Sequence, residues 1–301
     1  MAAAPTEDSL SALAVVLDCG AHWCRRKHED RAQILEQLLL FLNAYHLHSA
    51  SSLLTVFATH EATVRRLWPP GDGEDAAPGT PQQLRAAVAA GVESLAAEAP
   101  PDGSGDVAPL LSAALSAALC RLQRAKRLRA QVEPRVLLVS AAADSPAQYL
   151  PTMNCIFGAQ KLGVLIDAVN LDKSDSMLLQ QAAHLTGGLY LRPDEPTQRA
   201  LAQYLISCCL PDRFERQFVR APPQKHPETR ALCYLSKQPV EMGWACSICL
   251  TVFEDDVAVR KSGCPVCGSR FISLQPGGPA KKKRKTAPAA AAAPTAAAEP
   301  G

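Results

Sequence analysis

The sequence predicts an α/β protein with a doubly wound parallel sheet, followed by a small four-cysteine zinc module. Short apolar runs alternate with longer amphipathic stretches over most of the chain. A continuous apolar run is typical of a strand in a parallel sheet that helices cover on both faces. Towards the C-terminus two Cys-x-x-Cys pairs follow one another, which is the spacing of a four-thiolate zinc site.

Each element follows from its pattern. Residues 13–17 read Leu-Ala-Val-Val-Leu, which predicts a buried strand. In residues 30–44 one isoleucine and several leucines recur at helical spacing, which predicts an amphipathic helix. Ser174 is the expected N-cap of a later helix. The same criteria predict strands at 53–58, 135–140, 164–169 and 189–191, helices at 82–99, 108–129, 145–162, 175–185 and 197–210, and loops at 68–81 and 100–105.

The charge of the chain is unevenly distributed. The formal net charge is +2, but residues 281–285 contribute +5, so the rest of the chain carries −3. A slightly acidic body argues against broad phosphate binding by the main domain. The predicted helix 108–129 ends in a basic cluster, which we interpret as a solvated face matched to the helix dipole rather than a nucleic-acid patch. This cluster comprises Arg121, Arg124, Lys126, Arg127 and Arg129.

The sequence predicts a soluble, intracellular protein in a reducing compartment. Seven of the eleven cysteines lie outside the two pairs and are scattered, which does not suggest a disulfide framework. The N-terminus lacks the basic and apolar regions of a signal peptide. The longest apolar runs, such as residues 38–42, are too short to span a bilayer, so no membrane association is expected.

The two cysteine pairs predict one structural Zn²⁺ ion. Because all four ligand positions are thiolates, no position remains for a water molecule and the site is not catalytic. Pro265 and Gly268 suit the tight second turn. A RING ubiquitin ligase would need two interleaved sites, and the ligands suffice for one. Whether Cys233 also contributes stays open. The predicted ligands are Cys246, Cys249, Cys264 and Cys267.

These features divide the chain into five parts. They are an N-terminal tail (1–11), the α/β domain (12–212), a proline-rich connector (213–239), the zinc module (240–275), and a basic, Ala/Pro-rich tail expected to be disordered (276–301). A short basic run in a flexible tail favours a nuclear localisation signal, and a non-specific nucleic-acid or solubility tail is a compatible alternative. The run is Lys281, Lys282, Lys283, Arg284 and Lys285.

Two carboxylates follow predicted strands at the edge of the sheet where ligands bind in open α/β folds: Asp18 and Asp144. The first of them resembles the start of the metal loop of von Willebrand A domains, which reads Asp-x-Ser-x-Ser. Residues 18–22 read Asp-Cys-Gly-Ala-His, so both hydroxyl ligands are missing. Because Mg²⁺ needs oxygen ligands, we interpret the loop as degenerate and vestigial, used for packing or partner contact.

No catalytic motif is present. Cys19 and His22 lie beside Asp18, as in a thiol hydrolase, but no oxyanion-hole glycines accompany them. The sequence has no P-loop, no GxGxxG after the first strand, no HExxH and no GxSxG. The chain is therefore predicted not to be an enzyme and to have no small-molecule substrate.

Longer motifs carry a closer resemblance. Those that match are Asp144-Ser145, Gln148-Tyr149, Met153-Asn154, Ile156-Phe157, Ala159-Gln160-Lys161, Leu178-Leu179-Gln180-Gln181-Ala182, Thr186-Gly187-Gly188-Leu189-Tyr190-Leu191, Leu210-Pro211-Asp212 and Glu241-x-Gly243-x-x-Cys246-Ser247-x-Cys249-Leu250. With them, residues 13–285 resemble the small von Willebrand A/zinc-finger core subunits of the general transcription and DNA repair factor TFIIH. The predicted fold is accordingly a von Willebrand A-like doubly wound parallel sheet with a C-terminal zinc module.

This resemblance implies a non-catalytic scaffold in the nucleus that acts in RNA polymerase II transcription initiation and nucleotide excision repair. Its partners would be the other TFIIH core subunits, chiefly the larger von Willebrand A/zinc-bearing subunit, which regulates the repair helicase. Association with DNA would be indirect, through the complex. The family's A domain is itself degenerate at the metal site, in agreement with the missing serines.

Two other functions remain as alternatives. A nuclear zinc-ribbon protein would bind nucleic acid through Arg260, Lys261, Arg270 and the basic tail. A metal-dependent adhesion module would need Asp18 as a ligand. Within the zinc module, three apolar side chains either form a partner-docking surface or fold inward beneath the metal: Ile248, Leu250 and Val252.

Overall fold

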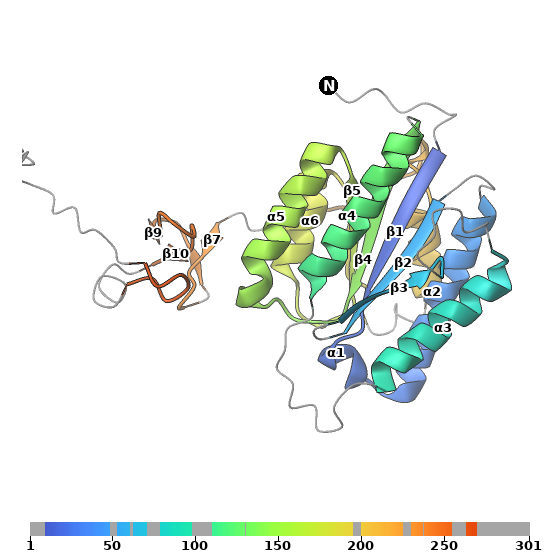
Figure 1. The fold of residues 1–301 in the computed structure, drawn as a ribbon, viewed down its shortest axis with the longest axis horizontal. Helices are drawn as coiled ribbons and strands as arrows, with labels where there is room; N and C mark the ends of the chain where they lie inside the picture. Colours follow the sequence, from blue (N-terminus) through green and yellow to red (C-terminus); the bar gives the residue numbers. More distant parts are fainter. Residues whose placement is uncertain are drawn as a thin grey trace, which may run out of the picture. The chain divides into compact units, whose positions relative to one another are not determined.

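The computed structural model describes residues 10–48, 53–60, 63–70, 79–97, 110–129, 131–194, 200–224, 230–236, 238–254 and 263–269. The chain divides into two compact units, residues 1–229 and residues 230–301 (Figure 1). The first unit has one sheet and two hydrophobic clusters, and the second has its own strands and its own cluster, so each unit is described by itself.

A six-stranded sheet in the order β3-β2-β1-β4-β5-β6 forms the centre of the first unit. Neighbouring strands run parallel except for β2 and β3, which are antiparallel. The predicted doubly wound parallel sheet is therefore confirmed, with the antiparallel edge strand β3 as the exception. The strands are β1 (Leu10–Asp18), β2 (Leu53–His60), β3 (Thr63–Trp68), β4 (Val132–Ser140), β5 (Leu165–Asn170) and β6 (Tyr190–Leu191).

Strand β3 was not predicted, so strand and helix do not alternate throughout. It lies at the edge of the sheet, where a strand needs no continuous apolar run. Its sequence, Thr-Val-Arg-Arg-Leu-Trp, lacks the pattern that identified the buried strands. Only its last two residues are fully buried, which is the expected burial of an edge strand.

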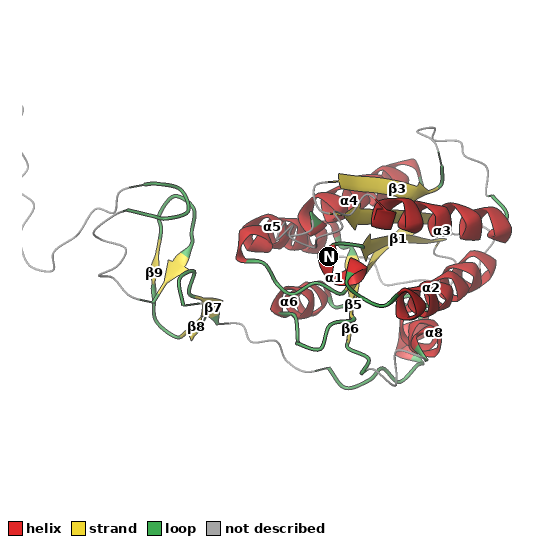
Figure 2. Ribbon diagram, turned by 90° about the horizontal axis from the view of Figure 1, so that it is seen from below, coloured by secondary structure: helices red, strands yellow, loops and turns green. Residues whose placement is uncertain are grey.

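Helices cover both faces of the sheet, as Figure 2 shows from below. Helices α2, α3 and α8 pack on one face, and α4, α5 and α6 pack on the other. No helix in the described ranges is both long and apolar enough to cross a membrane. The helices are α1 (Ala21–Cys24), α2 (His28–His48), α3 (Pro81–Ala97), α4 (Leu111–Leu128), α5 (Pro146–Leu162), α6 (Met177–Thr186) and α8 (Leu201–Tyr204), which continues as a π-helix (Leu205–Cys209).

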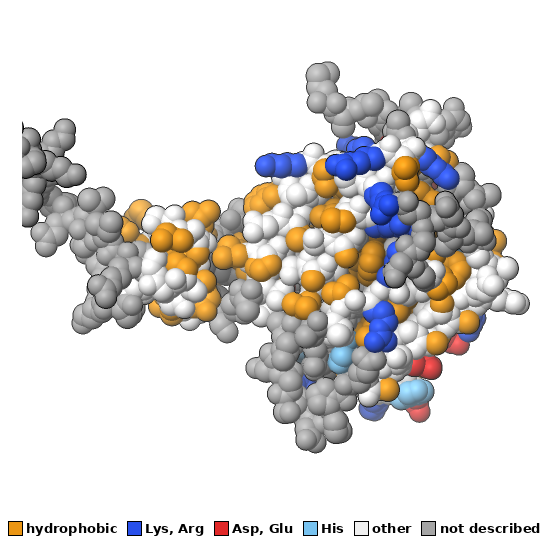
Figure 3. Space-filling model, in the orientation of Figure 1, with side chains coloured by type: hydrophobic (Ala, Val, Ile, Leu, Met, Phe, Trp, Pro, Cys, Tyr) orange, Lys and Arg blue, Asp and Glu red, His pale blue; other side chains and the backbone are white. Residues whose placement is uncertain are grey.

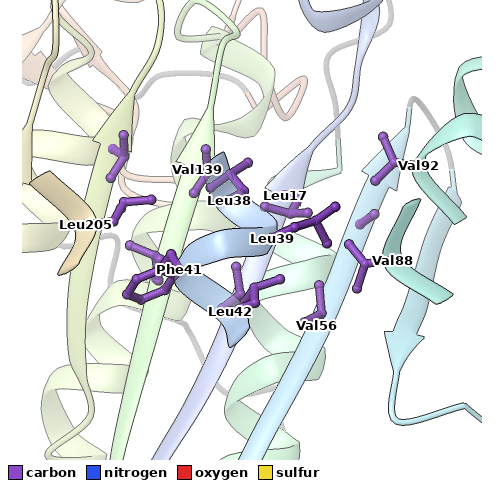
Figure 4. Packing of buried hydrophobic residues seen from close by; sticks show 14 of the residues in the cluster. Leu17, Leu38, Leu39, Phe41, Leu42, Val56, Val88, Val92, Val139 and Leu205 are labelled. Carbon is purple, nitrogen blue, oxygen red and sulfur yellow. The ribbon is translucent and has the colours of Figure 1, made fainter. Parts of the chain in front are cut away.

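Strand β1 supplies both cores of the unit. Because successive side chains of a strand point to opposite faces, Leu13, Val15 and Leu17 enter one core and alternate residues enter the other. In the first core Leu38, Leu39, Phe41 and Leu42 of α2 pack against the sheet, with residues of α3 and the π-helix beside them (Figure 4). Burying each such side chain contributes about 1.5–3 kcal/mol.

Two arginines, the buried Arg135 and the partly buried Arg216, bind the end of the first unit to its sheet. The guanidinium of Arg135, on β4, donates to the carbonyl oxygens of Cys209, Leu210 and Pro211 at 3.1, 3.2 and 2.6 Å. These carbonyls end the last helix, where no backbone donor remains for them. Arg216 forms a bidentate ion pair with Asp167 of β5, with N–O distances of 2.8 and 2.5 Å.

The second unit contains two short antiparallel pairs. Strands β7 (Ala231–Leu232) and β8 (Pro239–Val240) form one, and β9 (Trp244–Ala245) and β10 (Val252–Phe253) form the other. The division between the units falls inside the predicted connector 213–239. The connector begins in the first unit, where Arg216 binds the sheet, and its last part pairs with β8 residues in the second.

Replacing Arg216 with methionine is expected to destabilise the first unit by about 3–5 kcal/mol, because Asp167 would remain buried without its counter-charge. The free energy of unfolding, measured in urea, checks this value. Arg220→Met is the matched control, since Arg220 is exposed, and it should change stability by less than about 0.5 kcal/mol. Equal effects of the two substitutions would contradict the assigned importance of the ion pair.

Candidate metal centre

The four predicted zinc ligands come together in the second unit. The Sγ atoms of Cys246, Cys249, Cys264 and Cys267 all lie within 4.8 Å of one another. Cys246 Sγ lies 3.6 Å from Cys267 Sγ, and Cys249 Sγ lies 3.5 Å from Cys264 Sγ. Four sulfurs bound to zinc at about 2.3 Å occupy a tetrahedron with edges of about 3.8 Å. The cluster could therefore hold a metal ion, and a four-thiolate donor set fits zinc.

The same backbone turn presents both pairs. In the first turn Leu250 N–H donates to Cys246 O at 2.8 Å, and Cys246 N–H donates to Thr251 O at 2.9 Å. In the second, Gly268 N–H donates to Cys264 O at 2.8 Å, and Cys264 N–H donates to Ser269 O at 2.7 Å. Leu250 and Gly268 occupy equivalent positions with φ of 61° and 69°, the left-handed region that glycine favours.

The environments of the four thiols differ. A backbone N–H bond from Cys249 lowers the pKa of Cys246 to about 6. The side chain of Ser269 lowers the pKa of Cys267 in the same way. Burial raises the pKa of Cys264 to about 11, and the backbone N–H bonds from Cys267 and Val266 compensate a buried negative charge there only in part. A divalent cation among the sulfurs would supply that compensation and hold all four as thiolates.

Cys233 lies outside this cluster. It is buried, and its sulfur accepts hydrogen bonds from the backbone N–H groups of Ser236 and Glu254 at 3.5 and 3.3 Å. The sequence had left its contribution open. The proposed nucleic-acid contacts Arg260, Lys261 and Arg270 and the basic run 281–285 fall outside the described residues.

Asp18 is buried at the C-terminal end of β1, and its carboxylate is fully engaged. Its Oδ1 accepts the backbone N–H of Gly20 at 2.9 Å, and its Oδ2 accepts the hydroxyl of Ser140 at 2.6 Å. Burial raises the pKa of Asp18, and these two hydrogen bonds oppose that shift. The carboxylate therefore joins the ends of β1 and β4.

Asp144 caps helix α6. It accepts the hydroxyl of Ser176 at 2.5 Å and the backbone N–H groups of Met177 and Leu178 at 2.6 and 3.1 Å. These donors lie at the positive end of the helix dipole. The N-cap is Ser176 rather than the predicted Ser174, because it is Ser176 whose side chain accepts from Leu179 N–H.

The two aspartates line one small cavity of about 30 Å³. This volume is close to that of a single water molecule. Sequence reasoning therefore placed both carboxylates at the correct edge of the sheet. It missed Ser140 and Ser176, which bind them, because a serine at the end of a strand or in a polar loop carries no distinctive signal of its partner.

Known proteins match this chain in sequence and in fold. The family model described as "Transcription factor Tfb4" matches residues 10–268. "General transcription factor IIH subunit 3" of Dictyostelium discoideum is 30% identical over 257 residues, covering 79% of this chain and 68% of that protein. "General transcription and DNA repair factor IIH subunit tfb4" of Schizosaccharomyces pombe is 30% identical over 277 residues, covering 88% and 90%. The TFIIH p34 N-terminal domain superposes with a TM-score of 0.56 at 26% identity, covering 67% of this chain and 98% of that chain.

The fold and the sulfur cluster define a von Willebrand A-like α/β domain joined to a C-terminal four-cysteine module, as predicted. The chain belongs to the Tfb4 family of transcription factor IIH subunits. It is thus a TFIIH subunit of transcription and DNA repair. Members of this family are non-catalytic core subunits, so the prediction that the chain is not an enzyme is confirmed.

Adding Mg²⁺ is expected to leave the melting temperature unchanged, because both carboxylates already accept protein donors. A magnesium site filled at a hundred times its Kd would add about 2.7 kcal/mol of stability. Differential scanning calorimetry with and without about 5 mM Mg²⁺ separates the two cases. A clear rise in melting temperature would show that the loop still binds the ion.

The melting temperature of Asp18→Asn, measured at two pH values, tests the electrostatic environment of the same carboxyl. A carboxyl whose folded pKa is raised is most favourable when protonated, and its contribution to stability falls as pH rises through that pKa. Removing the buried charge should therefore preserve or increase the melting temperature at pH 7, and increase it less at pH 4. A large fall in the melting temperature of Asp18→Asn at pH 7 would contradict the conclusion that burial disfavours the charged form of Asp18.

Proposed function

We propose that this chain is a structural subunit of the TFIIH core that docks the larger von Willebrand A/zinc-bearing subunit, the regulator of the repair helicase. The exposed apolar surface of the four-cysteine module carries this proposal. Met242, Trp244, Ile248 and Leu250 leave 89%, 54%, 70% and 68% of their surface in water. Large apolar side chains gathered on a small unit are typical of an interaction site.

The geometry of the turns supports docking over inward folding. Ile248 and Leu250 project from the first cysteine turn, whereas the inward positions belong to Cys246, Phe253 and Cys264. Leucine is disfavoured at a φ of 61°, with a cost of about 1–2 kcal/mol, so its presence there calls for a benefit that glycine would not give. Burial against a partner is such a benefit.

We further propose that the module binds one structural Zn²⁺ ion through Cys246, Cys249, Cys264 and Cys267. The sulfur separations and the donor set support zinc in this position. Residues 240–254 and 263–269 of the module, which the structure describes, bury few apolar side chains, so a metal would supply much of the folding energy there. Within the described residues of the second unit the one exposed cation is Arg230, and this arginine pairs with Glu241, which disfavours phosphate binding by those residues.

Further parts of the proposal rest on sequence. The run Lys281 to Lys285 directs the chain to the nucleus, and DNA is reached mainly through the complex. The proposal keeps the five parts predicted from the sequence: the N-terminal tail, the A-like domain, the connector, the zinc module and the basic tail. The loop at Asp18 is vestigial as a metal site, which the internal hydrogen bonds of Asp18 and Asp144 support. No membrane or small-molecule substrate is involved.

Removing the zinc ligands should unfold the module and leave the first unit intact. We expect about one zinc per chain by mass spectrometric metal analysis, falling to nearly none in Cys246→Ser/Cys264→Ser. Amide exchange should then become fast in residues 238–254 and stay slow in β1. Cys120→Ser, which removes an exposed cysteine on α4, should retain the ion. A zinc-free chain with a protected module would contradict a structural metal.

Leu250→Gly tests docking without disturbing the turn, because glycine accepts the positive φ. Combined with Ile248→Ser, it should reduce recovery of the larger A-domain subunit from nuclear extract at least about tenfold, since burying one leucine contributes about 1.5–3 kcal/mol. Zinc content should stay at one ion. Leu47→Ser, which removes an equally exposed leucine from α2, is the control. If the Ile248→Ser/Leu250→Gly variant recovered the larger A-domain subunit as well as the unmodified chain does, these side chains would not form the docking surface.

A further inference from the structure

A third turn in the second unit is built like the two turns that present the four clustered cysteines, which we call the ligand turns. In each ligand turn the first cysteine donates its backbone N–H to the carbonyl oxygen five residues on, at 2.9 Å for Cys246 and 2.7 Å for Cys264. Cys233 makes the same bond to Gln238 O at 2.9 Å. The described residues of this turn are 233–236 and 238, and we call them the third cysteine turn.

The sulfur of the first cysteine is held in the same way in all three turns. In each ligand turn it accepts the backbone N–H of the residue three positions on, which is the second cysteine of the pair, Cys249 or Cys267. The corresponding donor to Cys233 Sγ is the backbone N–H of Ser236, at 3.5 Å. Ser236 therefore occupies the position that the second cysteine occupies in a ligand turn.

Hydrogen bonds take the place of a second thiolate in this turn. The Ser236 hydroxyl donates to Glu254 Oε2 at 3.0 Å, and the Glu254 backbone N–H donates to Cys233 Sγ at 3.3 Å. Burial raises the pKa of Cys233, but the hydrogen bonds that its sulfur accepts outweigh this effect and lower the pKa below its usual value. Donors from two segments of the chain thus stabilise a negative charge on this sulfur without a cation.

The third cysteine turn binds strand β10 and the residue after it. Tyr234 N–H donates to Val252 O at 2.9 Å, and the rings of Tyr234 and Phe253 meet edge to face with their centroids 6.2 Å apart. The next residue, Glu254, donates to the sulfur of Cys233. Three successive residues are therefore bound to one turn.

Strand β10 in turn fixes the first ligand turn. It begins directly after Thr251, whose carbonyl oxygen accepts the N–H of Cys246, and it pairs with β9, which precedes that turn. The exposed Ile248 and Leu250 lie between the two strands. Figure 3 shows hydrophobic side chains at the surface of the second unit. The position of the docking side chains therefore depends on how firmly β10 is held.

We propose that the third cysteine turn is a metal-free counterpart of the ligand turns, and that it positions β10 and with it the docking side chains Ile248 and Leu250. The positioning role rests on the proposed docking function, whereas the first part stands on the hydrogen bonds alone. A zinc ion would join the two ligand turns to each other, and serine is not among its usual ligands. In the third turn the bonds from Ser236 and Glu254 join the turn to β10 instead.

Cys233→Ala should speed amide exchange of residues 252–254 at least about tenfold in the zinc-loaded full-length chain, because the backbone N–H groups at its sulfur lose their acceptor. Zinc content should not change, because Cys233 lies outside the sulfur cluster. Cys233→Ser keeps an acceptor and should restore part of the protection. Cys120→Ala removes an exposed cysteine from α4 and should alter neither quantity. Unchanged exchange in Cys233→Ala would show that the turn does not hold β10.

Ser236→Cys tests the equivalence of the turns by the gain of a site. It places a thiol three residues after Cys233, as in the ligand turns, with the carboxylate of Glu254 as a third donor. Native mass spectrometry in excess Zn²⁺ should then show one ion more than in the unaltered chain. Leu235→Cys places the same thiol one residue earlier in the turn and should add no ion. Equal zinc binding by the two variants would overturn the proposal, as would an ion that the unaltered chain binds and Cys233→Ala loses.

Recovery of the larger A-domain subunit from nuclear extract separates this proposal from the docking function. Cys233→Ala should reduce recovery at least about threefold, and less than Ile248→Ser/Leu250→Gly does, because the docking side chains are still present. Full recovery with Cys233→Ala, beside reduced recovery with the docking variant, would contradict the positioning role. If neither variant reduces recovery, the docking function fails, and amide exchange and zinc binding decide whether the third turn is metal-free and holds β10.

Discussion

The structure depends on the burial of strand β1 on both of its faces. Leu13, Val15 and Leu17 enter one core while Ala12, Ala14 and Val16 enter the other, so neither face of the sheet can meet water. Helices must therefore cover both faces, which is why apolar runs alternate with amphipathic stretches. The covered faces leave the strand ends, the outer sides of the helices and the appended module as the surfaces open to a partner.

The carboxylates that follow the strands bind groups of the protein itself. In a metal-binding A domain the carboxylates at this edge face a cation, but here Asp18 joins β1 to β4 and Asp144 caps α6. Each aspartate satisfies backbone or hydroxyl donors that would otherwise lack a partner. Recognition then has to lie elsewhere, and we place it on the exposed apolar side chains of the four-cysteine module.

Most of the fold and the four-cysteine cluster could be predicted from the sequence, and the features that could not be predicted have physical causes. Continuous apolar runs identified every strand buried on both faces, and the two Cys-x-x-Cys pairs identified a cluster that needs no tertiary information. Strand β3 escaped because an edge strand with two arginines lacks that pattern. The partners Ser140, Ser176 and Arg216 escaped because the pairing of distant residues is set by topology, and a single sequence does not contain it.

The central claim is that the first cysteine turn of the module is a protein-docking surface. Hydrogen–deuterium exchange of zinc-loaded chain, free and within assembled TFIIH, tests it most directly. Burial of Ile248 and Leu250 against a partner should slow exchange of the exposed amides in residues 247–254 at least about tenfold in the complex, while β1 exchanges equally slowly in both. Equal exchange of residues 247–254 in the free and assembled states would contradict the claim.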